Sequence, residues 1–112
     1  MAAIKPTYGR LSRYGLIAFA SSLDQVGTMT RSVRDGARVL GVLAGHDKRD
    51  ATSSTEAVPD YEAACEAPVK GLRVGVVREA LNQVEDEDVR AAFTDAEAAL
   101  RDAGCTIVDV TL

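Results

Sequence analysis

The stretch Leu72-Arg73-Val74-Gly75-Val76-Val77 decides the fold class of this 112-residue chain. Its β-branched residues alternate with others, which predicts a strand. Asp86 then stands where a helix N-cap belongs, and Gly104 stands where that helix would end. The apolar positions between them recur at helical spacing: Val89, Ala92, Phe93, Ala96, Leu100 and Ala103. Because Cys105-Thr106-Ile107-Val108-Asp109-Val110 reads as a second strand, residues 71–112 predict a βαβ unit with parallel strands and a right-handed crossover.

The surface of this helix carries two charge pairs at i,i+4 spacing, Asp86–Arg90 and Glu97–Arg101, which we expect to support it. Two parallel strands with one helix still leave a sheet face and both edges uncovered. We therefore expect a piece of a larger α/β protein rather than a complete small domain.

A second helix is expected upstream, with Thr30 or Ser32 as its cap and Gly45 at its end. Its apolar or small residues form one stripe: Val33, Gly36, Ala37, Leu40, Leu43 and Ala44. Gly36 and Gly41 lower helix propensity but would let a neighbouring element pack closely.

Residues 46–70 form a polar connector with two prolines and few large apolar residues. A short helical piece is expected near residues 60–67. A connector of this length inside a compact domain is often functional or mobile. We therefore divide one partial domain into residues 1–45, this connector, and the βαβ unit of residues 71–112.

The start of the chain is irregular. The stretch Lys5-Pro6-Thr7-Tyr8-Gly9-Arg10-Leu11-Ser12-Arg13-Tyr14-Gly15-Leu16 excludes a long helix, because Pro6 lacks an amide donor and the glycines permit positive φ. An apolar run follows, within which residues 16–20 are the predicted strand. A segment so rich in special residues usually lines a site.

Composition and charge narrow the class of protein. The chain is 46% hydrophobic and 27% charged, which is ordinary for a soluble globular protein. Residues 1–50 carry a net charge of +4 and residues 51–112 one of -8, so only the basic half would attract an anionic partner. Cys65 and Cys105 lack metal-like spacing and indicate no disulfide scaffold. Without a signal-peptide pattern, we expect a cytoplasmic protein.

Residue type alone singles out two catalytic candidates. Ser21 and Ser22, with Lys5 as the base, could form a Ser-Ser-Lys relay for amide hydrolysis. Such hydroxyls more commonly end a strand and bond local backbone. His46 lies in a turn-like context, where a loop role is more common than a role as base or metal ligand.

An RNA-binding surface is a further alternative. Arg31, Arg34 and Arg38 fall near one helical face, and Tyr8 and Tyr14 could stack a base. A solvated arginine face and packed tyrosines are the more common arrangement.

Beside this reading stands a resemblance. The motif Lys5-Pro6-Thr7-Tyr8-Gly9-Arg10-x-Ser12-Arg13-Tyr14-Gly15-Leu16, then Ala18-Phe19-Ala20-Ser21-Ser22-Leu23-Asp24-Gln25-x-Gly27, resembles the amidase-signature family. Two later stretches agree, Thr30-Arg31-Ser32-Val33-Arg34-Asp35 and Gly45-His46-Asp47-x-Arg49-Asp50-Ala51-Thr52-Ser53. Within the family, the pattern is similar to the A subunits of glutamyl-tRNA(Gln) amidotransferases.

The resemblance implies a large mixed sheet between helices and a Ser-cisSer-Lys triad. It also implies an amidase subunit that releases ammonia from glutamine. Other amidotransferase subunits would be its partners, and one of them would use the ammonia, with ATP and magnesium, to convert Glu-tRNA(Gln) to Gln-tRNA(Gln). Contact with tRNA would occur only through that complex. Because no apolar run approaches the ~20 residues of a membrane span, we also expect no membrane partner.

Carried over residue by residue, the resemblance gives this chain no catalytic, cofactor-binding or metal site. The family's lysine lies far upstream, and both its serines precede the Gly-x-Lys-Pro-Thr segment. Lys5 matches the lysine of that segment, whereas Ser21 and Ser22 match the Ser-Ser-Leu-Asp segment. All three triad positions are therefore expected to lie outside these residues.

We accordingly expect an amidase-family piece that is inactive alone. The alternatives are a standalone binding or assembly module, one half of a split amidase, and a fragment of a generic amidase. Open sheet edges would also permit self-association.

Overall fold

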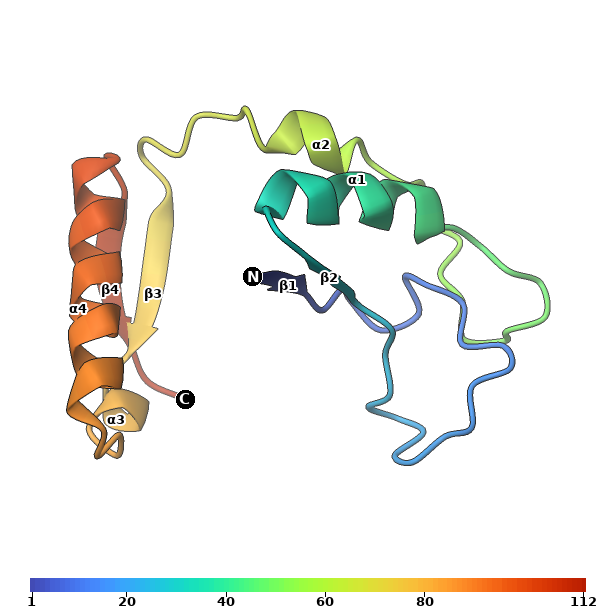
Figure 1. The fold of residues 1–112 in the computed structure, drawn as a ribbon, viewed down its shortest axis with the longest axis horizontal. Helices are drawn as coiled ribbons and strands as arrows, with labels where there is room; N and C mark the ends of the chain where they lie inside the picture. Colours follow the sequence, from blue (N-terminus) through green and yellow to red (C-terminus); the bar gives the residue numbers. More distant parts are fainter. The chain divides into compact units, whose positions relative to one another are not determined.

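The computed structural model describes all residues, Met1–Leu112. It divides into two compact units, Met1–Ala67 and Pro68–Leu112, each of which combines helices with a two-stranded sheet (Figure 1). The boundary falls inside the predicted connector, and the assignment of all residues to one partial domain stays a prediction. No helix combines the length and the apolar character that a bilayer crossing requires.

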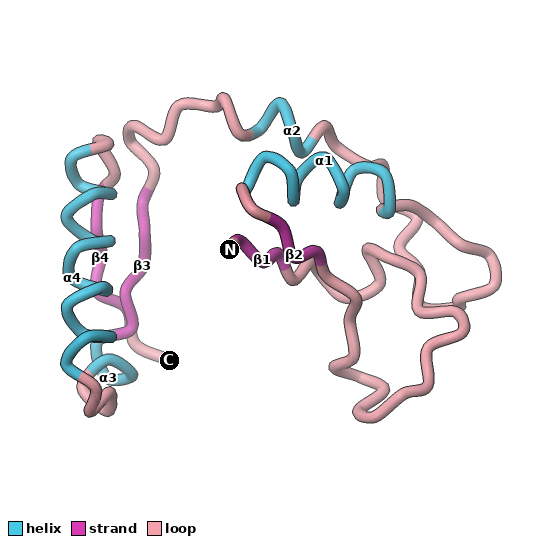
Figure 2. Tube along the Cα trace, in the orientation of Figure 1, coloured by secondary structure: helices cyan, strands magenta, loops and turns pink.

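The first unit has a small antiparallel sheet. Strand β1 (Ala2–Ile4) pairs with β2 (Thr28–Thr30), with Ala3 opposite Met29. Helix α1 (Val33–Leu43) contacts both strands, and α2 (Tyr61–Ala64) contacts α1. Long loops connect β1 to β2 and α1 to α2 (Figure 2). Both strands were missed in the sequence, because three residues are too few to show alternation; the short helix expected near residues 60–67 is confirmed.

Helix α1 begins where the sequence predicts. The Ser32 hydroxyl accepts a hydrogen bond from the Asp35 amide at 3.1 Å and caps the helix. The buried face is narrower than the predicted stripe and consists of Gly36, Ala37 and Leu40. Helix α1 ends at Leu43 with Ala44 as its C-cap residue, so Gly45 directly follows the helix end as predicted, and its amide donates to the Arg10 carbonyl at 3.2 Å.

The two glycines of α1 have different surroundings. A Cβ on Gly36 would lie 2.8 Å from Cδ1 of Ile4, so the predicted close packing is confirmed there. Nothing lies within 4 Å of a Cβ on Gly41, which lines a hollow of about 410 Å³. The prediction of close packing is therefore wrong for Gly41.

The predicted strand at residues 16–20 is also wrong, because these residues form turns and loop. Gly15 has a φ of +86°, which redirects the chain just before them. The amides of Phe19 and Ala20 donate to the Asp24 carboxylate at 2.7 and 3.1 Å. A carboxylate four to five residues away thus satisfies donors that a strand would give to its neighbour.

The second unit is the predicted βαβ unit. Strand β3 (Arg73–Val77) lies parallel to β4 (Thr106–Val110) and is joined to it through α3 (Arg78–Leu81) and α4 (Glu87–Asp102). Asp86 caps α4 as predicted, accepting from the amides of its first turn. Gly104 ends α4 at a φ of +90°, and its amide and that of Cys105 close a Schellman motif on Arg101 and Leu100, each at 2.9 Å.

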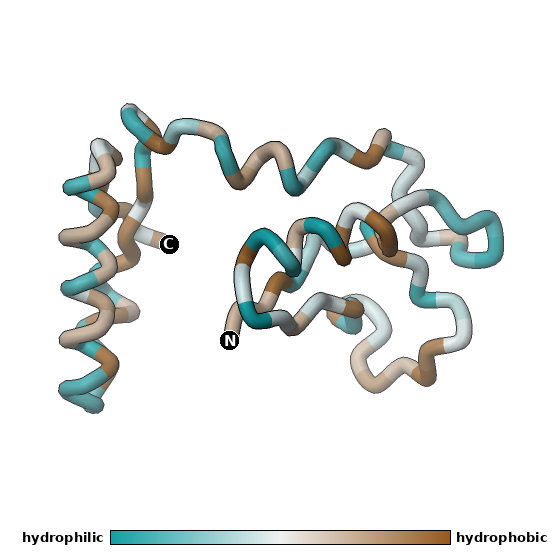
Figure 3. Tube along the Cα trace, turned by 45° about the horizontal axis from the view of Figure 1, so that its top comes forward, coloured by the Kyte–Doolittle hydropathy of each residue, from teal (hydrophilic) through white to brown (hydrophobic).

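The surface of α4 differs from the expected apolar face. Figure 3 shows polar and apolar residues intermixed along the helix, and two residues of the expected apolar face, Val89 and Phe93, are exposed. The buried residue of α4 is instead Glu97. The expected pair Glu97–Arg101 is confirmed at 3.3 Å, whereas Arg90 does not pair with Asp86 and donates to backbone carbonyls before the helix.

Candidate functional site

Two long loops of the first unit, residues 5–27 and 44–60, meet along their length. The Ser54 amide donates to the Gly9 carbonyl at 2.8 Å, and the Arg10 guanidinium donates to the carbonyls of Glu56 and Ala57 at 3.0 and 2.8 Å. Eight side chains that either join these loops or brace one of them internally are called here the two-loop network: Tyr8, Arg10, Ser12, Arg13, Asp47, Arg49, Asp50 and Ser53. Most of the resemblance motifs fall within it.

Asp47 is one centre of the network. Its carboxylate accepts from the Ser12 hydroxyl at 2.8 Å and from the Arg49 side chain at 3.1 Å, while its amide donates to the Ser53 hydroxyl at 2.9 Å. Hydrogen bonds from the side chain and backbone of Arg49, and then from Ser12, hold the pKa of Asp47 well below its usual range. This group is therefore a structural anion and not a proton donor or acceptor near neutral pH.

Asp50 is the second centre. One carboxylate oxygen accepts from the Arg13 amide at 2.8 Å, and the other accepts from the amide and hydroxyl of Thr52 at 2.9 and 2.7 Å. The Thr52 hydroxyl and these two amides lower the pKa of the Asp50 carboxyl. Asp50 thus binds the backbone of a loop 37 residues away.

The tyrosines of the first loop contact arginines. The Arg13 guanidinium lies 4.4 Å from the centroid of the Tyr8 ring, and Arg49 lies 4.6 Å from that of Tyr14. The Tyr8 hydroxyl donates to the Ser21 carbonyl at 2.9 Å, and Arg13 donates to the same carbonyl. On each tyrosine, an arginine therefore lies over a ring face that a stacked base would need. The stacking of RNA on these rings stays an untested hypothesis.

The catalytic candidates named from residue type are not brought together. Ser21, Ser22, Lys5 and His46 are all exposed, and the Lys5 ammonium donates only to the neighbouring Pro6 carbonyl at 3.2 Å. No hydrogen bond joins the side chains of Lys5, Ser21 and Ser22 in the structure. Nor do three or more His, Cys, Asp or Glu side chains gather in a cluster that could hold a metal ion.

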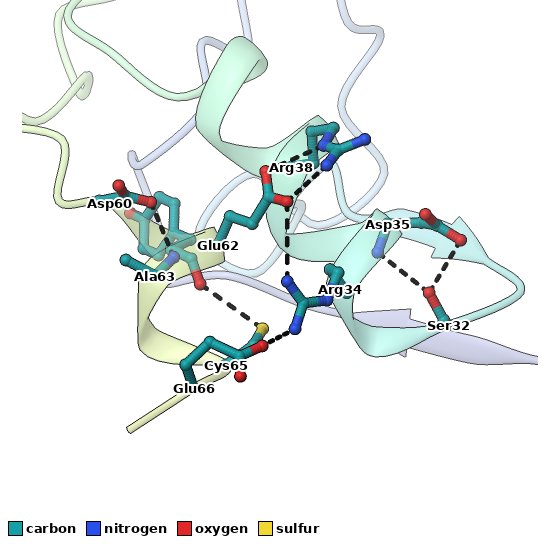
Figure 4. Close-up of polar contacts among 10 residues, drawn as sticks. Ser32, Arg34, Asp35, Arg38, Asp60, Glu62, Ala63, Cys65 and Glu66 are labelled. Carbon is teal, nitrogen blue, oxygen red and sulfur yellow. Dashed lines mark hydrogen bonds and ion pairs between the residues drawn. The ribbon is translucent and has the colours of Figure 1, made fainter. Parts of the chain in front are cut away.

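The arginines considered for RNA binding are mostly engaged within the first unit. Arg38 donates to Glu62 of α2 at 2.9 Å, and Arg34 pairs with Glu66 (Figure 4). Arg31 precedes α1 and does not share its face. The pairs with Glu62 and Glu66 fix α2 on α1, so their charge serves the packing of two helices.

Sequence reasoning missed the two aspartates that anchor the network. Asp47 and Asp50 appeared only as letters of a family motif. One local signal was available, because Asp50-x-Thr52 is a pattern in which a carboxylate bonds the backbone two residues on. The distant partners Ser12 and Arg13 carried no signal of their own.

A buried carboxylate anchors the second unit. Glu97 receives two hydrogen bonds from the Arg78 guanidinium, at 2.5 and 3.1 Å, and Arg78 also donates to Asp109 of β4 at 2.8 Å. The bonds from Arg78, and then the charges of Arg78 and Arg101, lower the pKa of Glu97 from its usual value of 4.5. The Arg78 guanidinium, directly after β3, thus links α4 to β4.

Replacing Glu97 with Gln is expected to reduce the acid sensitivity of the second unit. Because folding lowers the pKa of Glu97, its contribution to stability is present above pH 4.5 and is lost as the pH falls through the folded-state value. Urea unfolding, followed by the amide NMR signals of β3 and β4 from about pH 6 to about pH 3, measures this. The exposed Asp95 of α4 provides the control variant Asp95→Asn; equal acid sensitivity of Glu97→Gln and wild type would contradict the assignment.

Comparison with known proteins assigns this chain to a family. The family model described as Amidase matches residues 2–112. The A subunit of glutamyl-tRNA(Gln) amidotransferase from Granulibacter bethesdensis is 53% identical over 112 residues, which are 100% of this chain and 22% of the relative. The A subunit of the same name from Anaeromyxobacter sp. (strain K) is 57% identical over 109 residues, covering 97% of this chain and 22% of the relative.

Solved structures agree. The crystal structure of the A subunit of glutamyl-tRNA(Gln) amidotransferase from Thermotoga maritima matches with a TM-score of 0.89 and 40% identity, covering 96% of this chain and 24% of that one. The peptide amidase from Stenotrophomonas maltophilia matches with a TM-score of 0.73 and 32% identity, covering 93% and 22%. The chain thus spans about a fifth of the length of the proteins that it resembles. The resemblance seen in the motifs and the α/β fold class are confirmed, and the chain belongs to the amidase family.

Proposed function

We propose that this chain is a supporting part of the amidase subunit of a tRNA-dependent amidotransferase, the complex that converts Glu-tRNA(Gln) to Gln-tRNA(Gln) with ammonia from glutamine. The observation that carries the proposal is the 53% identity over 112 residues to the Granulibacter bethesdensis protein. By itself the chain is inactive, because the positions that match the family's catalytic lysine and serines lie outside these residues.

The geometry of the two-loop network favours a structural role for this chain over a catalytic one. Its carboxylates bind backbone amides and arginines and are kept ionised, so they have no proton to exchange near neutral pH. Ser21 and Ser22 are exposed, and the Lys5 ammonium donates to the Pro6 carbonyl rather than to either hydroxyl. In this proposal the loops form a rigid wall beside a site built by other parts of the subunit.

The proposed setting follows from the same identity. The other amidotransferase subunits are the partners, glutamine is the substrate, and tRNA is met only through the complex. ATP and magnesium act in one of those partners, and the complex works in the cytoplasm.

A segment exchange tests the proposal. In the Granulibacter bethesdensis protein, the matched 22% is replaced by this chain, and the chimera is purified with its partner subunits. We expect glutaminase activity from the chimera and none from the isolated chain. Turnover by the isolated chain, or a chimera that folds but releases no ammonia, would contradict the proposed function.

A further inference from the structure

Helix α2 is attached to α1 with little help from burial. None of its residues is buried, and Tyr61 lines two hollows, of about 410 and about 400 Å³, so the packing around it is sparse. The backbone hydrogen bonds that residues 64–67 donate all go to residues 60–64. The backbone therefore shapes α2 but does not tie it to α1, and side chains must supply the attachment.

The attachment consists of ion pairs. Arg38 of α1 donates to both carboxylate oxygens of Glu62, at 2.9 and 2.5 Å, while Arg34 lies 4.0 Å from one of these oxygens and pairs with Glu66 (Figure 4). These four side chains are called here the clasp. The hydrogen bond from Arg38 and the charges of both arginines lower the pKa of Glu62, so the clasp is charged near neutral pH. Strands β1 and β2 carry no charged side chain that could compete with it.

Solvent reaches the clasp. The side chains of Arg34 and Arg38 are 50% and 64% exposed, and that of Glu62 is 33% exposed. Exposed ion pairs contribute little individually and are screened by salt. The screening length falls from about 10 Å at ~0.1 M salt to about 3 Å at ~1 M salt. Because burial contributes little to holding α2, its attachment to α1 is expected to weaken as the ionic strength rises.

Helix α1 has its own attachment to the sheet. A Cβ on Gly36 would lie 2.8 Å from Ile4 of β1, and the Thr28 hydroxyl of β2 donates to the Gly36 carbonyl at 3.5 Å. Ala37 and Leu40 are buried on the same helix, and both also line the hollow of about 400 Å³ beside α2. Departure of α2 would therefore leave α1 in place and open an apolar face of α1 to solvent.

We propose that residues 60–66 form a detachable strap, which rising ionic strength releases from α1 by screening the clasp. Release uncovers the apolar face that contains Ala37 and Leu40, while α1 stays on β1 and β2. This device lies wholly in the first unit, goes beyond the proposed function and is independent of it.

A spin label on the strap measures its release in the 112-residue chain. Because Cys65 is exposed and Cys105 is buried, a nitroxide thiol reagent labels Cys65 selectively. Cys65 lines the same hollow as Val33 and Ala37, so the docked label broadens the amide NMR signals of α1. We expect about half or more of this broadening to be lost between ~0.02 M and ~1 M NaCl, with the α1 signals at their folded positions throughout.

A matched pair of variants assigns the effect to the clasp. Glu62→Gln removes its central carboxylate, and about half or more of the broadening is expected to be lost already at low salt. Glu56→Gln neutralises an exposed carboxylate of the same connector that forms no ion pair in the structure, and is expected to leave the broadening unchanged.

Three results would overturn the proposal. Broadening that persists either at high salt or in Glu62→Gln would show that packing holds the strap. Loss of the folded α1 signals together with the broadening would show that strap and helix unfold as one unit. Equal effects of Glu56→Gln and Glu62→Gln would assign the response to net charge rather than to the clasp.

Discussion

An alanine at Gly9 is expected to destabilise the first unit by about 2–4 kcal/mol, the sum of a backbone cost and a steric cost. The φ of Gly9 is +77°, which L-residues with a Cβ rarely adopt. An added Cβ would also lie 2.3 Å from the Thr52 carbonyl oxygen. The clash is not easily relieved, because the Gly9 amide donates to the Gln25 side chain at 3.0 Å and its carbonyl accepts from the Ser54 amide.

Gly15 provides the matched control. Its φ of +86° is similar, but nothing lies within 4 Å of an added Cβ, so Gly15→Ala should cost only about 1–2 kcal/mol. Urea unfolding followed by tyrosine fluorescence reports on this unit alone, since Tyr8, Tyr14 and Tyr61 all lie in it and tryptophan is absent. Equal effects of the two substitutions would show that the contact with Thr52 does not constrain the loops.

The features that the sequence predicts well in this chain are those set by residues close to one another along the chain. Ser32 and Asp86 cap helices that begin immediately after them. Gly104 follows the end of α4 and supplies the positive φ that this helix end requires. Each of these residues acts within a few positions along the chain. The β-branched residues of β3 likewise favour a strand by their own local preference.

What the sequence does not reveal depends on distant partners. The Asp24 carboxylate accepts from the Phe19 amide and holds a turn where a strand was predicted. Asp50 binds an amide 37 residues away. A carboxylate in a loop reads as a solvated charge until the fold shows which amides it meets. The burial of Glu97 has the same origin, because only the fold brings Arg78 to it.

Leu40→Ala is expected to cost about 2–5 kcal/mol, from lost burial and the cavity that remains. Leu40 is 5% exposed, and the buried apolar residues of the first unit are few: Leu11, Ala37 and Leu40. Val42 lies on the same helix at 81% exposure, so Val42→Ala should change the free energy of unfolding by no more than ~0.5 kcal/mol. The same tyrosine-monitored urea unfolding measures both variants.

This comparison decides which interaction holds the first unit together. If the apolar contacts of α1 dominate, Leu40→Ala lowers the urea midpoint as strongly as Gly9→Ala, although the two residues act in different parts of the unit. If the two-loop network dominates, Gly9→Ala is much the more damaging and Leu40→Ala resembles Val42→Ala. The small buried core favours comparable losses, because a unit with so few buried apolar side chains needs both its core and its network to offset the entropy of its long loops.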